Sequence, residues 1–157
     1  GEREPVGYYA WNRSTEQILF WSRYGFSLQL VNLRNNSARY ITGDAIPVSP
    51  QIIPGTDNFS FVHRQGNGEV WIKELNPTTF SIRPLVMIEG ENHHYAWTPN
   101  GSILMAQGAK LKQWSPGSKW EAVADFTELG MQSPTRVAIS PDGKKLAVVA
   151  VEGKPGR

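Results

Sequence analysis

The sequence contains no cysteine. Without thiols the chain can form no disulfide framework, no thiolate nucleophile and no zinc site built on cysteine. The compartment stays open, because many periplasmic proteins also lack cysteine. Long apolar runs are missing too, since no window approaches the roughly 18 consecutive apolar residues that a membrane-spanning helix needs. We therefore expect no membrane span.

An excess of one charge is also missing. The 16 lysines and arginines nearly balance the 14 aspartates and glutamates, which leaves a net charge of +2 at pH 7. The charges are interspersed along the chain and form no basic patch. Nucleic acids and anionic membranes attract proteins through such patches. We therefore predict no nucleic-acid partner.

Catalytic signatures are absent from the sequence. It has no nucleophile elbow, no H-E-x-x-H and no phosphate-binding P-loop. Gly66-x-Gly68 lacks the third glycine of a dinucleotide site and leads into a predicted strand. Several aspartates are scattered over turns and strand ends: Asp44, Asp57, Asp125 and Asp142. Nothing pairs them as acid and base, so we predict no catalytic residue, no metal ion and no cofactor, and lean against an enzyme.

Glycine, proline and aromatic residues are abundant. The chain has 15 glycines, 11 prolines, 6 tryptophans and 5 tyrosines, a composition typical of an all-β chain with many tight turns. The stretch Thr135–Ala150 shows the pattern most clearly. Its apolar runs Val137–Ile139 and Leu146–Ala150 flank the turn sequence Ser140–Gly143. A β-branched run on each side of a Pro-Asp-Gly turn predicts a hairpin.

The same pattern recurs along the chain. In the last copy, the apolar anchor Ile139 is followed by Leu146 seven positions on and by Val148 nine positions on. Apolar residues follow three earlier anchors at the same offsets: Trp11, Ile52 and Trp97. Successive anchors are therefore about 41 to 45 residues apart. A repeat of about 40 residues with short strands between turns indicates the blades of a β-propeller.

The repeat resembles that of the TolB-like propellers, in which a Ser-Pro-Asp-Gly turn joins the first two strands of each blade. The fourth copy, SPDGKKLAVVA, matches closely, and the third, AWTPNGSILMA, matches well. The first two copies are degenerate, since Arg13-Ser14-Thr15 replaces Pro-Asp-Gly in the first. The resemblance implies an all-β fold of four-stranded antiparallel blades. It also implies a bacterial protein that is secreted or periplasmic.

The strand pattern predicts one partial propeller domain over residues 1–157. We expect three whole blades, at about 7–43, 47–88 and 93–127, and half a blade at about 135–151. Propellers close as rings of about four to eight blades, and closure protects the strand edges. We therefore expect this segment to belong to a larger propeller or to be completed by a second copy.

Blade topology also predicts a binding face. The connections after the second and the fourth strand of each blade lie on one face. The residues expected there are His63, Arg64, Glu91, His93 and His94. Imidazoles beside a carboxylate are able to bind a divalent metal, but neighbouring His93 and His94 point in opposite directions. Solvated loop histidines are the simpler interpretation, and we predict a face that binds a ligand or a partner.

The tryptophans and two glycines give further expectations. Repeat position places Trp11, Trp97 and Trp114 in the core between blades, whereas Trp71 and Trp120 are better candidates for exposure. Two glycines also differ in their predicted turns. Gly143 is expected to close a tight inner turn, and Gly117 to lie in a looser outer one.

The function that these observations favour is binding without chemistry. A rigid stack of blades would present the loops of one face to a protein or a ligand. The resemblance keeps an alternative open, namely an accessory or partial propeller domain of a secreted hydrolase or of a metal-dependent polysaccharide lyase. The expected partners are another protein or the remainder of a parent chain, and self-association is possible.

Overall fold

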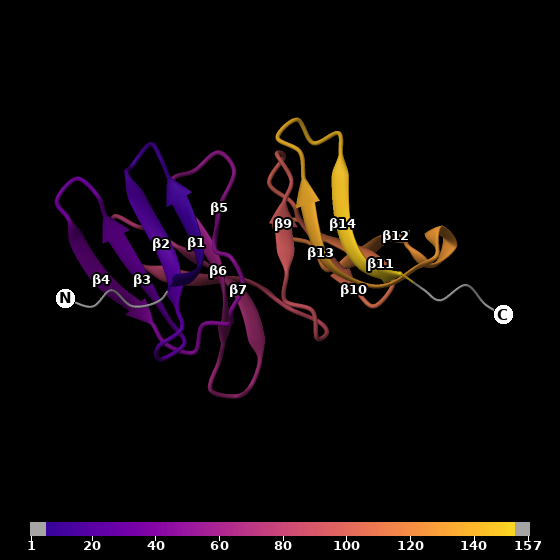
Figure 1. Cartoon of the computed structure of the whole chain (residues 1–157), viewed down its shortest axis with the longest axis horizontal. Coiled ribbons are helices and arrows are strands. Elements are labelled where there is room, and N and C mark those ends of the chain that lie inside the picture. Colours follow the sequence, from indigo (N-terminus) through magenta and orange to yellow (C-terminus); the bar gives the residue numbers. More distant parts are fainter. Residues whose placement is uncertain (1–5, 153–157) are drawn as a thin grey trace. The chain divides into compact units, whose positions relative to one another are not determined.

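The computed structural model describes residues 6–152 (Figure 1). Within this part of the chain every regular element is a β-strand, apart from one short 3₁₀ turn. The strands form three four-stranded sheets and one two-stranded sheet, and all of them pair antiparallel with their neighbours in sequence. The predicted all-β class and the four-stranded antiparallel sheets are confirmed. The chain divides after Ile88 into two compact units, which we describe separately.

Unit 1 contains two of the four-stranded sheets. Sheet 1 consists of β1 (Val6–Asn12), β2 (Gln17–Ser22), β3 (Ser27–Asn32) and β4 (Ser37–Thr42). Sheet 2 consists of β5 (Gln51–Ile52), β6 (Phe59–Arg64), β7 (Val70–Leu75) and β8 (Ile82–Met87). Each sheet is a meander, so the connections after its first and third strands lie at one end and the connection after its second strand at the other.

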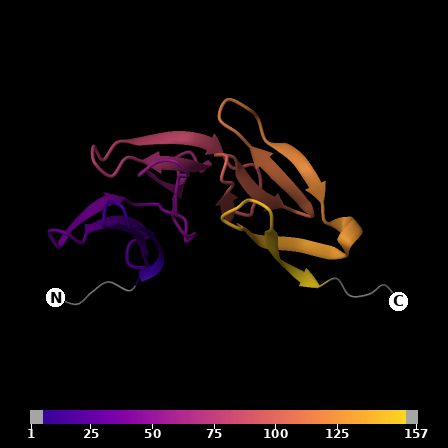
Figure 2. The same cartoon turned by 90° about the horizontal axis from the view of Figure 1, so that it is seen from above.

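Unit 2 contains the other two sheets, which Figure 2 shows from above. Sheet 3 consists of β9 (Tyr95–Trp97), β10 (Ile103–Gln107), β11 (Lys110–Trp114) and β12 (Glu121–Asp125). The 3₁₀ turn η1 (Thr127–Leu129) leads into sheet 4, which consists of β13 (Met131–Ile139) and β14 (Leu146–Glu152).

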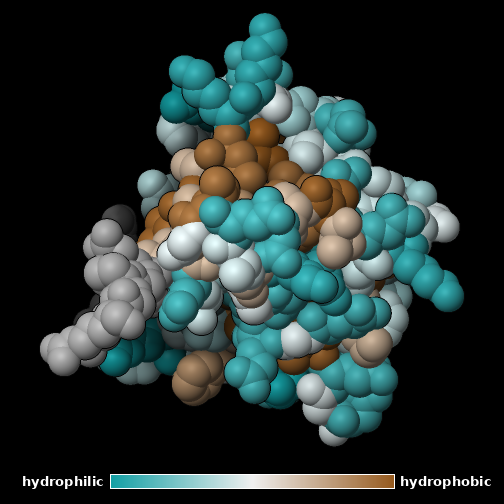
Figure 3. Space-filling model, turned by 90° about the vertical axis from the view of Figure 1, so that its right-hand side faces the viewer, coloured by the Kyte–Doolittle hydropathy of each residue, from teal (hydrophilic) through white to brown (hydrophobic). Residues whose placement is uncertain are grey.

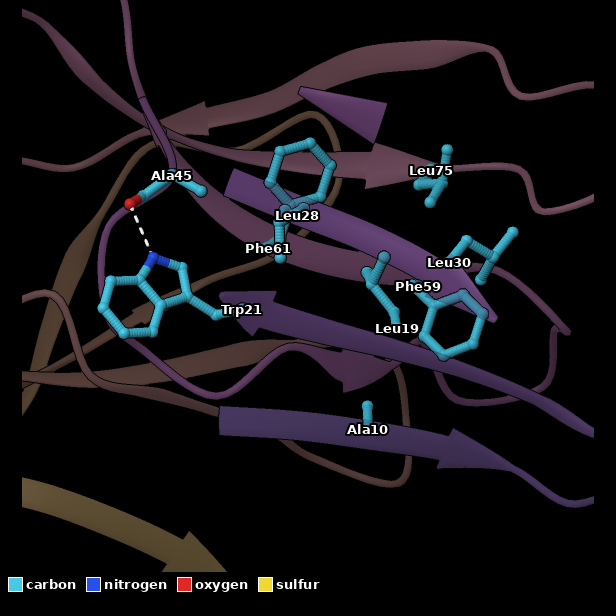
Figure 4. Close-up of a cluster of buried hydrophobic side chains, with 9 residues drawn as sticks. All are labelled: Ala10, Leu19, Trp21, Leu28, Leu30, Ala45, Phe59, Phe61 and Leu75. Atoms are coloured by element: carbon cyan, nitrogen blue, oxygen red, sulfur yellow. Dashed lines mark hydrogen bonds between the residues drawn. The ribbon is translucent and has the colours of Figure 1, made fainter. Parts of the chain in front are cut away.

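The core of unit 1 lies between its two sheets (Figure 4). One face of sheet 1 packs against one face of sheet 2, and the buried side chains are Ala10, Leu19, Trp21, Leu28, Leu30, Ala45, Phe59, Phe61 and Leu75. Alternate residues of each strand supply this layer, as the two-residue period of a strand requires. The indole Nε1 of Trp21 donates to the Ala45 carbonyl oxygen at 2.9 Å, which satisfies the polar atom of a buried tryptophan.

The opposite face of sheet 1 is aromatic and open. Tyr9, Trp11 and Tyr40 are 63%, 48% and 63% exposed. The predicted burial of Trp11 is therefore wrong for the described chain, because no other element of unit 1 covers this face of the sheet. Instead, the Arg13 guanidinium lies 4.9 Å from the Trp11 ring centroid. Trp114, by contrast, is buried as predicted.

Unit 2 has its own core between sheets 3 and 4. Ala96, Ala106 and Leu111 of sheet 3 pack with Phe126 and Val137. The outer face of sheet 4 is open. Its β14 residue Val149 is 58% exposed, and Figure 3 shows apolar residues gathered over part of the side on which β14 lies in Figure 1.

The strand register shows how closely the copies of the repeat agree. Trp11 pairs with Ile18, Ile52 with Phe59 and Ile139 with Leu146, so the anchor faces the residue seven positions on in three copies. In the third copy Trp97 pairs with Ile103, six positions on. The connection Thr98–Ser102 is thus one residue shorter than the others.

The expected contrast between Gly143 and Gly117 is not found. Gly143 has φ of 72° and Gly117 has φ of 82°. Each of their turns is closed by a backbone hydrogen bond across four residues, Gly143 to Ser140 at 2.8 Å and Ser118 to Ser115 at 2.9 Å. Both turns are therefore tight, and both use a left-handed conformation that glycine adopts without strain.

Candidate functional site

His63 and Arg64 end strand β6, whereas the sequence analysis expected them in the following loop. The side chain of His63 is half-buried on the face of sheet 2 that packs against sheet 1. Its Nε2 lies 3.3 Å from the Thr42 Oγ1 at the end of β4, and its ring meets Phe61 edge-on. Arg64 is exposed. At this position, Arg64 is therefore the side chain available to a partner.

The surroundings of His63 favour its neutral form. Burial lowers the pKa of His63, and the positive charge of Lys73 lowers it further. The carboxylate of Asp44 acts in the opposite direction, but burial is the larger cause. A neutral imidazole keeps one donor and one acceptor nitrogen near pH 7.

Glu91, His93 and His94 lie in unit 2, in the segment that leads from β8 to β9. This segment is anchored to β10 through Asn92. The Asn92 Nδ2 donates to the Ala106 carbonyl at 2.8 Å, and the Gln107 Nε2 donates to the Asn92 carbonyl at 2.7 Å. Sequence reasoning missed this anchor, because Gln107 lies 15 residues further along the chain.

The anchor also orients the histidine pair. The Asn92 Oδ1 accepts the backbone N–H of His94 at 3.1 Å. Burial lowers the pKa of His94, and the positive charges of Arg136 and of a protonated His93 lower it further. Glu91 is exposed at the start of the segment. The loop thus offers an exposed carboxylate and a half-buried imidazole whose lowered pKa favours the neutral form.

The five predicted site residues fall into two groups. His63 and Arg64 lie in unit 1, whereas Glu91, His93 and His94 lie in unit 2. That they share one binding face stays a prediction. Among residues 6–152, no group of three or more histidine, aspartate or glutamate side chains is placed to hold a metal ion.

A polar network in unit 1 escaped the sequence analysis. The buried Asn12 donates through its Nδ2 to the Asp57 carbonyl oxygen at 3.1 Å, and the Ser14 Oγ donates to the Asp57 Oδ1 at 2.5 Å. These hydrogen bonds, first from Ser14 and then from Asn12, lower the pKa of Asp57. The network joins the first turn of sheet 1 to the first turn of sheet 2. It fixes the two turns against each other.

The comparisons with known proteins concern the fold. No protein-family model and no curated protein matches the sequence. The structure of TolB from Acinetobacter baumannii is similar, with 19% identity and a TM-score of 0.73, over 96% of this chain and 39% of that chain. A putative TolB from Agrobacterium tumefaciens shares 17% identity with a TM-score of 0.69, over 94% of this chain and 54% of that chain.

A third similar structure is that of a nidogen/laminin complex. It shares 13% identity with a TM-score of 0.65, over 94% of this chain and 57% of that chain. All three likenesses extend over nearly the whole of this chain, which spans well under two thirds of each matched structure. At these identities the likeness establishes the architecture and not the activity. The described residues thus have the fold of a portion of a TolB-like β-propeller.

Proposed function

We propose that the chain is a non-catalytic propeller scaffold that binds another protein through the segments around Arg64 and Glu91. The observation that carries the proposal is the anchoring of the Glu91–His94 segment by Asn92. A surface that is already ordered loses little conformational entropy on binding, which raises its affinity. Exposed polar side chains on such a segment are well suited to recognition.

The chemistry of these side chains suits a protein surface. Arg64 and Glu91 are exposed and carry opposite charges, and His63 and His94 add half-buried imidazoles whose pKa values are lowered. A surface with both charges resembles the polar rim of a protein–protein interface. A site for the nucleic-acid backbone would instead be rich in positive charges. One of the structures with a similar fold is a complex of two proteins.

The test is a binding experiment with matched variants. The 157-residue chain is immobilised, and partners are captured from an extract of the source cells and identified. We expect the double variant Arg64→Ala, Glu91→Ala to lose most of the captured partner. The control is Arg23→Ala, Glu121→Ala, which removes the same two charges from other exposed positions. Equal capture by both double variants would refute the proposed face.

The open faces of the end sheets support a second part of the proposal. Tyr9, Trp11 and Tyr40 on sheet 1 and Val149 on sheet 4 are exposed, although aromatic and β-branched side chains are stabilised by burial. The chain spans 39% of the similar TolB structure. We infer that further blades of a parent chain cover these faces, and that the isolated segment self-associates through them.

Light scattering after size exclusion tests this second part. We expect the isolated 157-residue chain to form dimers or larger species in a concentration-dependent manner. The variant Trp11→Ser, Tyr40→Ser should shift the population toward the monomer, because it removes two large apolar side chains from the open face. A wild-type chain that stays monomeric at all concentrations would contradict the inference.

We also propose that the protein is periplasmic or secreted. Among the described residues, none of the helical segments has the length and apolar character that crossing a bilayer requires. The similarity in fold to TolB structures supports a periplasmic or secreted protein. Fractionation of the source cells, followed by detection with an antibody, provides the test, and recovery in the cytoplasmic fraction would refute it.

A further inference from the structure

Unit 1 has a cavity that none of the predicted site residues line. Its volume is about 310 Å³, and it is lined by Gln17, Leu30, Asn32, Asn35, Ser37, Ala38, Arg39 and Phe80. The lining residues come from the turn ends of sheet 1 and from the connection between β7 and β8. His63 and Arg64 lie at the opposite end of sheet 2. A cavity of this size falls in the range of small-molecule sites.

The cavity wall is rich in hydrogen-bond donors and has a positive charge. Arg39 supplies the guanidinium group, and no aspartate or glutamate is among the lining residues. The Asn32 Oδ1 accepts the Arg34 N–H at 2.9 Å, and the Asn35 Oδ1 accepts the Ser37 N–H at 3.1 Å. Because backbone donors occupy both amide oxygens, the NH₂ groups are the parts of these side chains left to meet a ligand.

One acidic side chain next in sequence to the lining residues is already paired. Glu16 precedes the lining residue Gln17 in sequence, and its Oε2 accepts the Arg34 Nε–H at 3.0 Å. Arg34 also donates to the Ser14 carbonyl at 3.2 Å. The Glu16 carboxylate is therefore held by Arg34, and Arg39 is the only charged residue among those that line the cavity.

Phe80 closes one wall in a conformation that few bulky residues adopt. Its φ is 62°, a left-handed conformation that is uncommon for aromatic residues and costs free energy when one adopts it. The turn is held by the Phe80 N–H, which donates to the Asn76 carbonyl at 2.8 Å. The phenyl ring lies 3.9 Å from the Arg39 Cζ. Stacking on the ring orients the planar guanidinium group.

We propose that this cavity binds a small ligand with a carboxylate attached to an apolar body. The guanidinium of Arg39 matches a carboxylate in planar, bidentate geometry. The amide groups of Asn32 and Asn35 supply further donors. The buried Leu30 at the base and the Phe80 ring form the apolar part of the wall. The site is independent of the protein-binding face proposed above, since none of the residues that line the cavity belongs to that face.

Amide NMR spectra of the full 157-residue chain, titrated with benzoate, test the proposal. Benzoate has the planar carboxylate and the apolar ring that the cavity should accept. We expect saturable shifts at the amides of Ser37, Ala38, Arg39 and Phe80, with a dissociation constant on the order of millimolar for so small a ligand. Benzamide has the same shape without the charge, and it should produce much weaker shifts.

Matched variants separate the site from a general charge effect. Arg39→Gln should weaken benzoate binding about tenfold or more, because it removes the charged hydrogen-bond donor. Arg23→Gln removes the same charge from an exposed turn at the other end of sheet 1 and should leave the affinity unchanged. Arg39→Lys keeps the charge without the planar fork and should give an intermediate affinity. Phe80→Gly suits the left-handed conformation and should weaken binding by removing the wall.

Several results would overturn the proposal. Benzoate shifts that do not saturate, or that fall outside the cavity, would show that no site exists. Equal shifts with benzamide would show that the cavity does not recognise the carboxylate group. If Arg39→Gln and Arg23→Gln bound benzoate with equal affinity, any loss of binding would be due to net charge and not to the position of Arg39. Each variant is first compared with the wild type in its ligand-free spectrum, so that a loss of folding is recognised before binding is measured.

Discussion

The first turn of sheet 1 and the only turn of sheet 4 among the described residues reverse the chain by different means. In unit 2, the turn of sheet 4 is closed by bonds among its own residues. Gly143 donates to the Ser140 carbonyl at 2.8 Å, and the Ser140 Oγ donates to the Asp142 Oδ1 at 2.6 Å. The Lys145 N–H then donates to the Ser140 Oγ at 2.9 Å. All the hydrogen-bonding groups that close this turn therefore lie within six consecutive residues.

The corresponding turn of unit 1 depends on a distant part of the chain. Within the turn, the Asn12 Oδ1 accepts the Ser14 N–H at 3.0 Å and the Thr15 N–H at 3.4 Å, and it lies 2.7 Å from the Ser14 Oγ. Glu16 takes the left-handed conformation, with φ of 55°. Asn12 and Ser14 then both donate to Asp57, more than 40 residues away in sequence. Nevertheless, the first strand pair has the same register as the last, with each anchor opposite the residue seven positions on.

The two turns give the same strand register through different hydrogen bonds. A local motif specifies its turn without help from the rest of the fold, so its loss is a local event. A turn held by long-range hydrogen bonds forms only when the neighbouring sheet is in place, and its loss also weakens the packing between sheets. The degenerate first copy is therefore expected to be more sensitive to polar substitutions, and the fourth copy to changes of backbone conformation.

The largest effect is expected for Gly143→Val. A β-branched residue in the left-handed conformation costs on the order of 1–3 kcal/mol. A Cβ at this position would also approach the Pro99 ring to 3.4 Å. Gly117→Val should cost slightly less, because its φ is similar and a Cβ there has no neighbour within 4 Å. Urea unfolding of both variants gives the measurement. A Gly143→Val chain as stable as the wild type would contradict the left-handed turn.

A somewhat smaller loss is expected for Asn12→Ala. This substitution removes the hydrogen bonds to Asp57 and leaves the Ser14 N–H without its acceptor, which together should cost about 2 kcal/mol in unfolding free energy. The matched change in unit 2 is Asp142→Ala, which removes an exposed carboxylate from the other turn. It should cost less than about 1 kcal/mol. Equal losses in the two variants would remove the distinction between long-range and local turns.

Glu16→Gly should change stability by less than about 1 kcal/mol. Glycine relieves the left-handed strain, but it loses the exposed ion pair with Arg34 and adds freedom to the unfolded chain. The effects oppose each other and nearly cancel. The reverse change, Gly143→Glu, offers no relief and should destabilise by about 1–2 kcal/mol. Thermal unfolding of the two variants gives the comparison, and similar losses in both would show that Glu16 is unstrained.

The smallest effect concerns pH. Each unit has a half-buried histidine, His63 or His94, whose pKa lies below the ordinary value of 6.5. The folded state therefore binds fewer protons than the unfolded chain as the pH falls through that value, so stability decreases with acid. The urea midpoint should be lower near pH 5.5 than near pH 7.5. Replacing both residues by glutamine should reduce this difference, and an unchanged pH dependence would place its origin elsewhere.

The sequence predicted the strands better than their surroundings. Alternating apolar residues between Gly- and Pro-containing turns predicted the strands, because both patterns are local, and the resemblance to TolB-like propellers implied their antiparallel pairing. Burial at equivalent repeat positions was less predictable. Trp11 and Ile139 occupy the same position, yet Trp11 is 48% exposed whereas Ile139 packs against the core of unit 2. A strand's pattern marks which face is apolar but not whether another sheet covers that face.

For the candidate sites too, the sequence determined some features and the tertiary structure determined others. The sequence alone determined the class of fold, the repeat and the residue types from which a binding surface can be made. Only the tertiary structure decided that Asn92 is anchored by Gln107, that Asn12 binds Asp57, and that Arg39 lies over Phe80 at a cavity. These contacts join residues far apart in sequence. Their geometry depends on how whole sheets pack, which no local pattern encodes.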